Sequence, residues 1–358
     1  MNNLRLDSPE IYKQYDPEGM LNRIHEFPRL CEQAWQMAMN FDLPSDYTRV
    51  DKVVILGMGG SAIGADLVAS LVVPEAKLPI TVCRGYELPA FTNAKTLVIA
   101  SSYSGNTEET LSSFEQALKT GAKKLVITTG GKLKAVAEKR NIPVFSFEYK
   151  AQPRAALPFS LMPILCFLQR LGFISDKSQD LTETVSVLEQ LSPRINEDIP
   201  LSQNPAKQLA SKLYNHLPVI YGAGIVSEVA HRWKTQLNEN SKAWGFYEVF
   251  PELNHNAVVG YQFPKELAGK IVVVLLKSSL LPQRIQLRYP VTGQLLEQAG
   301  VSYQVVNGNG VSPLSQIMSL ILFGDYVSYY LAMLYQIDPS PVKAINFLKE
   351  QLGQNKGE

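Results

Sequence analysis

Residues 53–72, VVILGMGGSAIGADLVASLV, place a short apolar run, a glycine-rich turn and an apolar helical segment in succession. The pattern predicts a strand over Val53–Leu56 and a helix over Ala62–Val72. The same order follows in Leu97–Ala100, a predicted strand, and Thr107–Lys119, a predicted helix. Strands that alternate with helices form parallel sheets that are covered on both faces. This stretch therefore predicts a doubly wound α/β fold.

The second half of the chain shows the same alternation. PVIYGAGIVSEVAHR, residues 218–232, resembles VVILGMGGSAIGADL, residues 53–67, in its order of strand, Gly-x-Gly and helix. The chain has 358 residues, more than the ~250–300 at which a single core usually stops growing. Between the halves, Ser175–Asn204 is polar and contains prolines. We therefore expect two doubly wound domains with flanking helices, residues 1–175 and 176–358.

The overall composition argues against several classes of protein. The chain has 34 Lys+Arg and 33 Asp+Glu, and a charge so close to zero gives no reason to expect a nucleic-acid partner. The most apolar stretch, Ile317–Leu334, is interrupted by Gly324 and Asp325, so no membrane span is expected. The N-terminus has neither the basic start nor the apolar segment of a secretory signal. We expect a soluble cytoplasmic protein.

The sequence also gives no pattern of metal ligands or disulfides. Cys31, Cys83 and Cys166 lie far apart in apolar surroundings, which matches neither a disulfide framework nor a zinc spacing. No His/Glu cluster of the kind that binds catalytic metals occurs in the sequence. Neither a metal nor a cofactor is expected.

The glycine turn, Gly57-Met58-Gly59-Gly60-Ser61-Ala62, allows three interpretations. Glycines permit positive φ and let backbone amides approach an anion at a helix N-terminus. The turn also satisfies the dinucleotide pattern Gly-x-Gly-x-x-Ala, but a NAD enzyme would place an acidic residue about 20 positions further on. The next strand ends at Cys83-Arg84-Gly85 instead, so an NADP enzyme remains possible, with Arg84 at the 2′-phosphate. The third interpretation is a tight turn without a ligand.

The next loop, SSYSGNTEET at residues 101–110, favours a monophosphate. Ser102, Ser104 and Thr107 place three hydroxyl groups around a glycine at the start of a helix. Hydroxyl groups and helix-end amides around one point suit a single phosphate, whose charge the helix dipole stabilises. A capping loop that happens to be rich in serine is the alternative. The predicted phosphate site consists of Gly59, Gly60, Ser61, Ser102, Ser104 and Thr107.

Several motifs then resemble a known family. The serine loop and the GMGGS turn resemble the sugar isomerase (SIS) domain, which binds the phosphate of phosphosugars. The segments QPRAALP (152–158), NENSK (238–242), PELNHN (251–256) and DPSP (338–341) resemble the bifunctional phosphoglucose/phosphomannose isomerases. The resemblance extends from roughly Met20 to Gly353. It implies two SIS domains of flavodoxin-like topology and, without a metal, interconversion of glucose 6-phosphate, and mannose 6-phosphate, with fructose 6-phosphate. Such an enzyme acts in glycolysis and gluconeogenesis.

An aldose–ketose isomerase needs a base that carries a proton between C2 and C1 and a group that stabilises the cis-enediol(ate). Glu239 lies near the end of a predicted helix, where the negative end of the dipole favours a protonated carboxyl group. Arg154 is a permanent cation beside an apolar helix. From the residues alone, Glu239 could be a surface carboxylate and Arg154 half of a surface ion pair. By resemblance, Glu239 is the base and Arg154 stabilises the enediolate oxygens.

The resemblance assigns the matching histidine, His255, to acid–base work in ring opening, and implies a homodimer in which it reaches the site from the neighbouring subunit. His255 lies between Asn254 and Asn256, and we expect these polar neighbours to fix its tautomer. A loop histidine without a chemical role is the alternative.

The resemblance also assigns Lys349 to the sugar oxygens during ring opening. On the predicted final helix, Lys349 shares a stripe with Val342, Ile345 and Leu352, so we expect it to face protein. A snorkelling lysine at a frayed end is the alternative. Val342 stands where some family members carry a threonine linked to acceptance of both C2 epimers, so activity on glucose 6-phosphate is better supported than activity on mannose 6-phosphate.

Two rivals to an isomerase remain. A regulatory SIS protein would bind phosphosugars without catalysis, and it would need the serine loop but not Glu239, His255 or Lys349. An NADP oxidoreductase would use the Gly-x-Gly-x-x-Ala turn. Glucosamine-6-phosphate synthase also has two SIS domains, but its N-terminal cysteine nucleophile is absent here.

Overall fold

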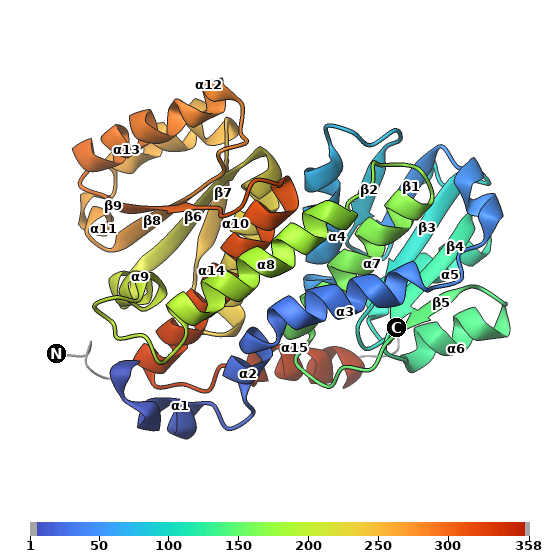
Figure 1. Ribbon diagram of the computed structural model, residues 1–358, viewed down its shortest axis with the longest axis horizontal. Helices are drawn as coiled ribbons and strands as arrows, with labels where there is room; N and C mark the ends of the chain where they lie inside the picture. The colour runs from blue at the N-terminus through green and yellow to red at the C-terminus, as the bar shows by residue number, and fades with distance from the viewer. Residues whose placement is uncertain (1–5, 355–358) are drawn as a thin grey trace.

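The computed structural model describes residues 6–354 and contains two parallel β-sheets, one in each half of the chain (Figure 1). The five strands of the first sheet lie in the order β2-β1-β3-β4-β5, which is the flavodoxin-like order. They are β1 (Lys52–Leu56), β2 (Ile80–Cys83), β3 (Thr96–Ser101), β4 (Lys123–Thr128) and β5 (Val144–Ser146).

The second sheet repeats this topology without a fifth strand. Its order is β7-β6-β8-β9, and every pair is parallel. In both sheets the first strand lies second from one edge, with its successors on both sides. Val54 of β1 pairs with Val98 in one sheet, and Ile220 of β6 pairs with Val274 in the other. The strands are β6 (Leu217–Ala223), β7 (Phe246–Phe250), β8 (Ile271–Lys277) and β9 (Ser302–Asn307).

Helices cover both faces of the first sheet, because alternate residues of its central strands enter different cores. Ile55 and Ile99 pack with α3 and α7 on one face, whereas Val54 and Val98 pack with α5 and α6 on the other. The two-domain, doubly wound α/β prediction for the fold is confirmed in both halves. The helices of the first half are α1 (Pro9–Tyr15), α2 (Met20–His25), α3 (Phe27–Met39), α4 (Gly59–Val72), α5 (Glu108–Leu118), α6 (Gly131–Lys139) and α7 (Leu157–Arg170).

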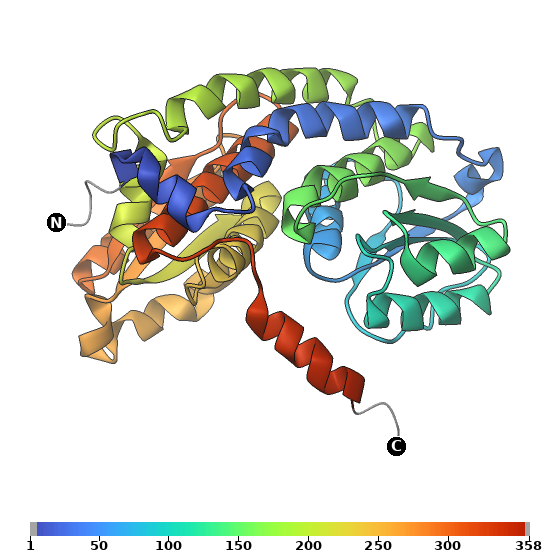
Figure 2. The ribbon, with the colours of Figure 1, turned by 90° about the horizontal axis from the view of Figure 1, so that it is seen from below.

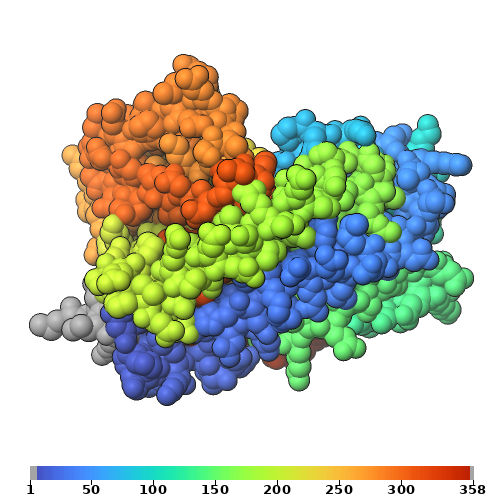
Figure 3. All heavy atoms as spheres, viewed as in Figure 1, coloured from blue at the N-terminus to red at the C-terminus, as the bar shows by residue number. Residues whose placement is uncertain are grey.

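Two long helices link the halves. α8 (Ser178–Ile195) lies within the polar stretch predicted as the domain boundary and packs against both α3 and α14. Figure 3 shows α3 and α8 side by side on the surface. The remaining helices are α9 (Pro205–Leu213), α10 (Ser227–Glu239), α11 (Lys265–Ala268), α12 (Gln283–Gln286), α13 (Arg288–Gln298), α14 (Pro313–Tyr335) and α15 (Lys343–Gln354).

α14 is the central helix of the second half. By length and by its mean hydropathy of 1.5 it would suit a membrane span, but 94% of that window is buried inside the protein, as in the core helix of a large domain. The two residues that interrupt its apolar run have packing roles. A Cβ atom on Gly324 would lie 2.3 Å from the Trp233 indole nitrogen, and Asp325 accepts hydrogen bonds from Arg232 and Gln236.

Candidate active site

The two predicted phosphate loops lie next to each other at the carboxyl ends of β1 and β3. The backbone N–H of Tyr103 donates a hydrogen bond to Ser61 Oγ over 3.2 Å, which joins the loops. Ser102 and Thr107 are hydrogen-bonded through their hydroxyl groups at 2.9 Å. The structure therefore brings together the hydroxyl groups of both predicted loops.

Both helix N-termini at these loops lack a side-chain cap. Thr107 is the N-cap of α5 and Met58 the N-cap of α4, yet neither side chain accepts a hydrogen bond from its helix. Ser104 is exposed and Thr107 half-buried, whereas Ser61 and Ser102 are buried. Uncapped N-termini present backbone amides and the positive end of the dipole to an anion.

Glycine is required in the serine loop because of its close approach to the next loop. Gly105 has φ of +65°, and a Cβ atom there would lie 1.8 Å from the Gly130 carbonyl oxygen. The Tyr103 hydroxyl donates to the carbonyl of Ala151 over 2.9 Å, which ties the serine loop to the segment that leads to Arg154. Neither contact was predicted, because both depend on partners distant in sequence.

Arg154 lies in a short 3-10 turn, Pro153–Ala156, and is only 2% exposed. Its guanidinium group makes four hydrogen bonds: Nε donates to Asn240 Oδ1 (2.6 Å), Nη1 to Glu239 Oε2 (3.4 Å), and Nη2 to the carbonyls of Pro339 (2.6 Å) and Ser340 (3.0 Å). Burial lowers the pKa of Arg154 and the charge of Glu239 opposes that shift, yet an arginine stays charged in proteins. The structure thus holds a fixed cation beside Glu239.

Glu239 is the last residue of α10, and its side chain is 29% exposed. It is therefore accessible to a ligand while its partner Arg154 is not. The phosphate loops adjoin this pair, because a Cβ atom on Gly60 would lie 3.1 Å from the Pro153 carbonyl oxygen and 3.6 Å from Arg154 Cα. A continuous set of contacts consequently joins the phosphate loop of the first half to the carboxylate of the second.

A pocket of about 630 Å³ opens beside Glu239. Val342, which replaces the family threonine, lines this pocket together with Glu239 and Lys242. The position that the resemblance links to epimer choice thus faces the same space as the candidate base.

His255 ends a short 3-10 turn, Glu252–His255, and is exposed. It does not line the pocket beside Glu239, and its side chain makes no hydrogen bond to another residue among those that the structure describes. The expectation that its neighbours fix its tautomer is wrong, because Asn254 bonds to Arg288 and Thr292, and Asn256 to Glu252 and Ala257. Within one chain His255 stands apart from Glu239.

Lys349 lies on α15, which projects away from the body of the molecule (Figure 2). No residue of α15 is buried, and Lys349 itself is exposed. The prediction that its stripe faces protein within the chain is wrong. Ile345 (40% exposed), Leu348 (56%) and Leu352 (55%) leave the apolar side of the helix open.

Two residues of the site were missed. Asn240 accepts from Arg154 and donates through Nδ2 to Ser328 Oγ on α14 over 3.0 Å; its place next to Glu239 in NENSK was the available signal. Arg232 donates to the Arg154 carbonyl (3.0 Å) and to Asp325 (3.2 Å). Burial raises the pKa of Asp325, and Arg232 opposes this shift.

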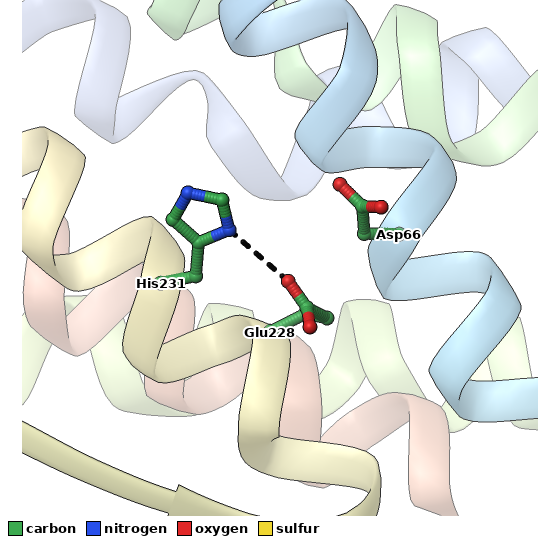
Figure 4. Close-up of side chains that lie close together, drawn as sticks. All are labelled: Asp66, Glu228 and His231. Atoms are coloured by element: carbon green, nitrogen blue, oxygen red, sulfur yellow. Dashed lines mark hydrogen bonds and ion pairs between the residues drawn. The ribbon is translucent and has the colours of Figure 1, made fainter. Parts of the chain in front are cut away.

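One group of potential metal ligands, Asp66, Glu228 and His231, occurs among residues 6–354, with ligand atoms within 4.8 Å of one another (Figure 4). The expectation of no such cluster is wrong, because α4 and α10 bring together residues remote in sequence. Each member already has a partner: Arg84 forms an ion pair with Asp66, and His231 Nδ1 lies 3.1 Å from Glu228. These contacts give each of the three side chains a charged or hydrogen-bonding partner within the protein. They also engage Arg84, the residue that an NADP enzyme would need.

Known proteins resemble this chain over most of its length. Residues 202–352 match the family model of the bacterial phospho-glucose isomerase C-terminal SIS domain. A bifunctional phosphoglucose/phosphomannose isomerase of Caldicellulosiruptor bescii is 44% identical over 94% of this chain and 100% of its own length. One from Aquifex aeolicus is 36% identical over 87% of this chain and 93% of its own.

A likeness to solved structures supports the fold. A hypothetical protein of Thermus thermophilus superimposes with a TM-score of 0.75 at 18% identity, covering 100% of this chain and 94% of that protein. Taken with the sequence identities, these findings show that the chain is an isomerase and belongs to the bifunctional phosphoglucose/phosphomannose isomerase family.

Proposed function

We propose that this isomerase interconverts glucose 6-phosphate, and mannose 6-phosphate, with fructose 6-phosphate through a cis-enediol(ate), without a metal. The observation that carries the proposal is the pairing of Arg154, buried and held by four hydrogen bonds, with the accessible carboxylate of Glu239 at 3.4 Å. The proposal is supported by the close approach of Gly60, in the glycine turn that we propose to bind phosphate, to the turn of Arg154.

In this mechanism the uncapped start of α5, with Ser102, Ser104 and Thr107, binds the phosphate. The Glu239 carboxylate removes the proton from C2 of the open-chain aldose, and the C2–H electron pair forms the C1–C2 double bond while the carbonyl oxygen at C1 gains negative charge. Arg154 stabilises that charge. Glu239 then returns the proton to C1, while the proton of the C2 hydroxyl passes to the negatively charged oxygen on C1, so that a ketone forms at C2 and a hydroxyl group at C1. One carboxylate thus serves both carbons.

Replacing Glu239 with Gln tests the base. Glutamine keeps the size and a hydrogen-bonding oxygen but cannot accept the proton, so turnover should fall by about 10²–10⁴-fold while fructose 6-phosphate still binds. Turnover is measured in a coupled assay with a chelator present, and binding by calorimetry. Glu189→Gln, on an exposed position of α8, is the matched control and should behave as wild type.

Other outcomes of this assay would contradict the proposal or support one of the alternative functions. Wild-type turnover in Glu239→Gln overturns the assignment of the base. Wild-type protein that binds phosphosugar without turnover is the regulatory SIS protein. Turnover that requires added metal contradicts metal independence.

The proposed enzyme is a homodimer in which His255 and Lys349 complete the site. Exposure of both residues in the single chain supports this, as does the apolar surface around them. Phe263 (72% exposed) lies in the segment that follows His255, and Phe347 (63%) lies on α15 with Lys349. Large exposed apolar side chains gathered near functional residues are typical of an interface.

Mixed dimers of two inactive variants, Glu239→Gln and His255→Asn, test whether His255 crosses the interface. If it does, each hybrid contains one intact site, and a random mixture should regain about a quarter of wild-type activity. If His255 acts within its own chain, both sites of every hybrid are defective, and the mixture stays inactive. Light scattering of the mixture confirms that dimers are present. We place this dimer in the cytoplasm, in sugar-phosphate metabolism.

A further inference from the structure

Lys242 makes contacts that the proposed mechanism does not use. It follows the NENSK glutamate by three positions and adopts a left-handed backbone conformation, with φ of +53°. Its Nζ atom donates to the carbonyl of Glu239 over 2.6 Å and to the carbonyl of Pro339 over 2.8 Å. The lysine therefore connects the end of α10 to the segment that precedes α15.

The turn that carries Lys242 is fixed to the core on its inner side. Asn240 Nδ2 donates to Ser328 Oγ over 3.0 Å, and Ser241 Oγ donates to the Ser328 carbonyl over 2.6 Å. Both residues are buried. The backbone of Lys242 is thereby held in place, so that its side chain has a defined origin from which to reach Pro339.

The segment that receives this bond is stiff. Asp338-Pro339-Ser340-Pro341 contains two prolines, whose rings fix φ and restrict the residues before them. The Ser340 N–H donates to Asp338 Oδ1 over 2.9 Å. The Pro339 carbonyl accepts from both Lys242 (2.8 Å) and Arg154 (2.6 Å). Since α15 begins only four residues after Pro339, at Lys343, fixing this carbonyl sets where α15 starts.

We infer that Lys242 is a positioning residue for the isomerase reaction: with Arg154 it clamps the Pro339 carbonyl, and so fixes the start of α15, and with it Lys349, relative to Glu239. This inference rests on the proposed function, because it concerns the geometry of that same site. Arg154 alone would hold the Pro339 and Ser340 carbonyls from a single nitrogen atom, Nη2, about which the segment 338–341 could pivot.

The charge environment of Lys242 supports a role that depends on pH. Desolvation, followed by the charge of Arg154, lowers its pKa to about 8, and Asp338 and Glu239 oppose that shift. Lys343 on α15 lines the same pocket. Because the pKa is below that of a free lysine, the ammonium group is charged below pH 8 and becomes neutral as the pH rises through that value. The clamp should weaken over the same range.

A purely structural role is the competing explanation, since a lysine that donates to the last carbonyls of a helix caps its C-terminus. A cap would contribute to stability and leave the catalytic pH profile unchanged. Kinetics at several pH values, compared between a neutral and a charged substitution, separates the two roles. Lys242→Met removes the charge at similar size, and Lys242→Arg keeps a charge that does not titrate below pH 12.

The experiment measures kcat and KM for fructose 6-phosphate from pH 6.5 to 9.5 for wild type, both Lys242 variants and Lys234→Met, a control on α10, the helix that precedes Lys242. We expect Lys242→Met to lower kcat about tenfold, as for a misplaced catalytic group, with KM within about twofold because the phosphate site is untouched. Lys242→Arg should restore kcat and remove the alkaline decline near pH 8 that wild type shows. The control should match wild type.

Hydrogen exchange of the backbone amides of 343–354 should be faster in Lys242→Met than in Lys242→Arg. The inference is overturned if Lys242→Met keeps wild-type kcat, or if Lys242→Arg retains the decline near pH 8. It is also overturned if the kcat of the variants follows their melting temperatures. Failure of the proposed function looks different, because wild type itself would then show no turnover.

Discussion

The two βα units that begin the sheets share a topology but use opposite ends of their helices. Neither α4 nor α10 has a side-chain cap at its start. In the first unit, α4 begins at Gly59, separated from β1 by two residues, and a Cβ atom on Gly59 would have nothing within 4 Å. In the second, a 3-10 turn, Gly224–Val226, lies between β6 and α10. The backbone is closely packed in that turn and leaves no room for a ligand beside Gly222, because a Cβ atom there would lie 2.3 Å from the Val226 carbonyl oxygen. The first unit is therefore open to an anion at its N-terminal end, whereas the second contributes Glu239 at its C-terminal end.

The loops after β3 and β8 differ in the same way. Ser102 and Thr107 after β3 bond to each other, beside the exposed Ser104. Ser278 and Ser279 after β8 instead both bond to the side-chain amide of Gln316 on α14. Related loops thus carry similar hydroxyl groups, but those of the second half are engaged in internal packing. In the proposed site, one half supplies the groups that bind the phosphate and the other supplies a carboxylate, so a single site forms between two similar halves.

The largest effect is expected where the two halves meet, at Arg154→Lys. Lysine keeps the charge but has three donors instead of the planar five-donor group, so it cannot replace all four hydrogen bonds that Arg154 makes to Asn240, Glu239 and the carbonyls of Pro339 and Ser340. We expect kcat to fall by about 10²–10³-fold, as when a preorganised donor is lost. Steady-state kinetics measures the loss. Turnover near the wild-type level would show that catalysis does not depend on the hydrogen bonds that Arg154 makes to the second half.

A smaller effect is expected from matched substitutions of the corresponding serines. Ser102→Ala should raise KM for fructose 6-phosphate about tenfold, the cost of about one hydrogen bond to a charged group, with kcat little changed. Ser278→Ala should leave KM unchanged and lower the free energy of unfolding by about 1 kcal/mol, because it removes one hydrogen-bond partner of Gln316. Equal effects of both substitutions on KM would contradict the division of roles between the halves.

Most of the fold follows from local pattern. The buried strands β1 and β3 are apolar runs bounded by turns, and their predicted limits, Val53–Leu56 and Leu97–Ala100, agree with the structure to within about one residue. α6 and β7 were missed for physical reasons. α6 is short and rich in lysine, and β7 is an edge strand whose side chains are mostly exposed, so neither has the periodicity of a buried element.

The site was predictable where chemistry is local and not where it depends on distant partners. The hydroxyl cluster of the serine loop was predicted from its position at a helix start, whereas Glu239 was singled out as the base by the resemblance of NENSK to the family. The hydrogen-bond partners of Arg154 could not be predicted, because Asn240 and Pro339 are far from it in sequence. The apolar stripe of α15 was identified, but periodicity shows only that a face is apolar and not which surface covers it.

The packing of Trp233 against Gly324 affects the intrinsic fluorescence of the protein. Trp35 and Trp233 are buried, at 2% and 1% exposure, whereas Trp244, two residues beyond Lys242, is 73% exposed. The indole of Trp233 also donates to the Leu320 carbonyl over 2.9 Å, so its emission depends on the docking of α10 against α14. Intrinsic fluorescence of this protein thus combines two interior reporters with one at the rim of the NENSK turn, and substituting Trp244 alone isolates the signal of the interior.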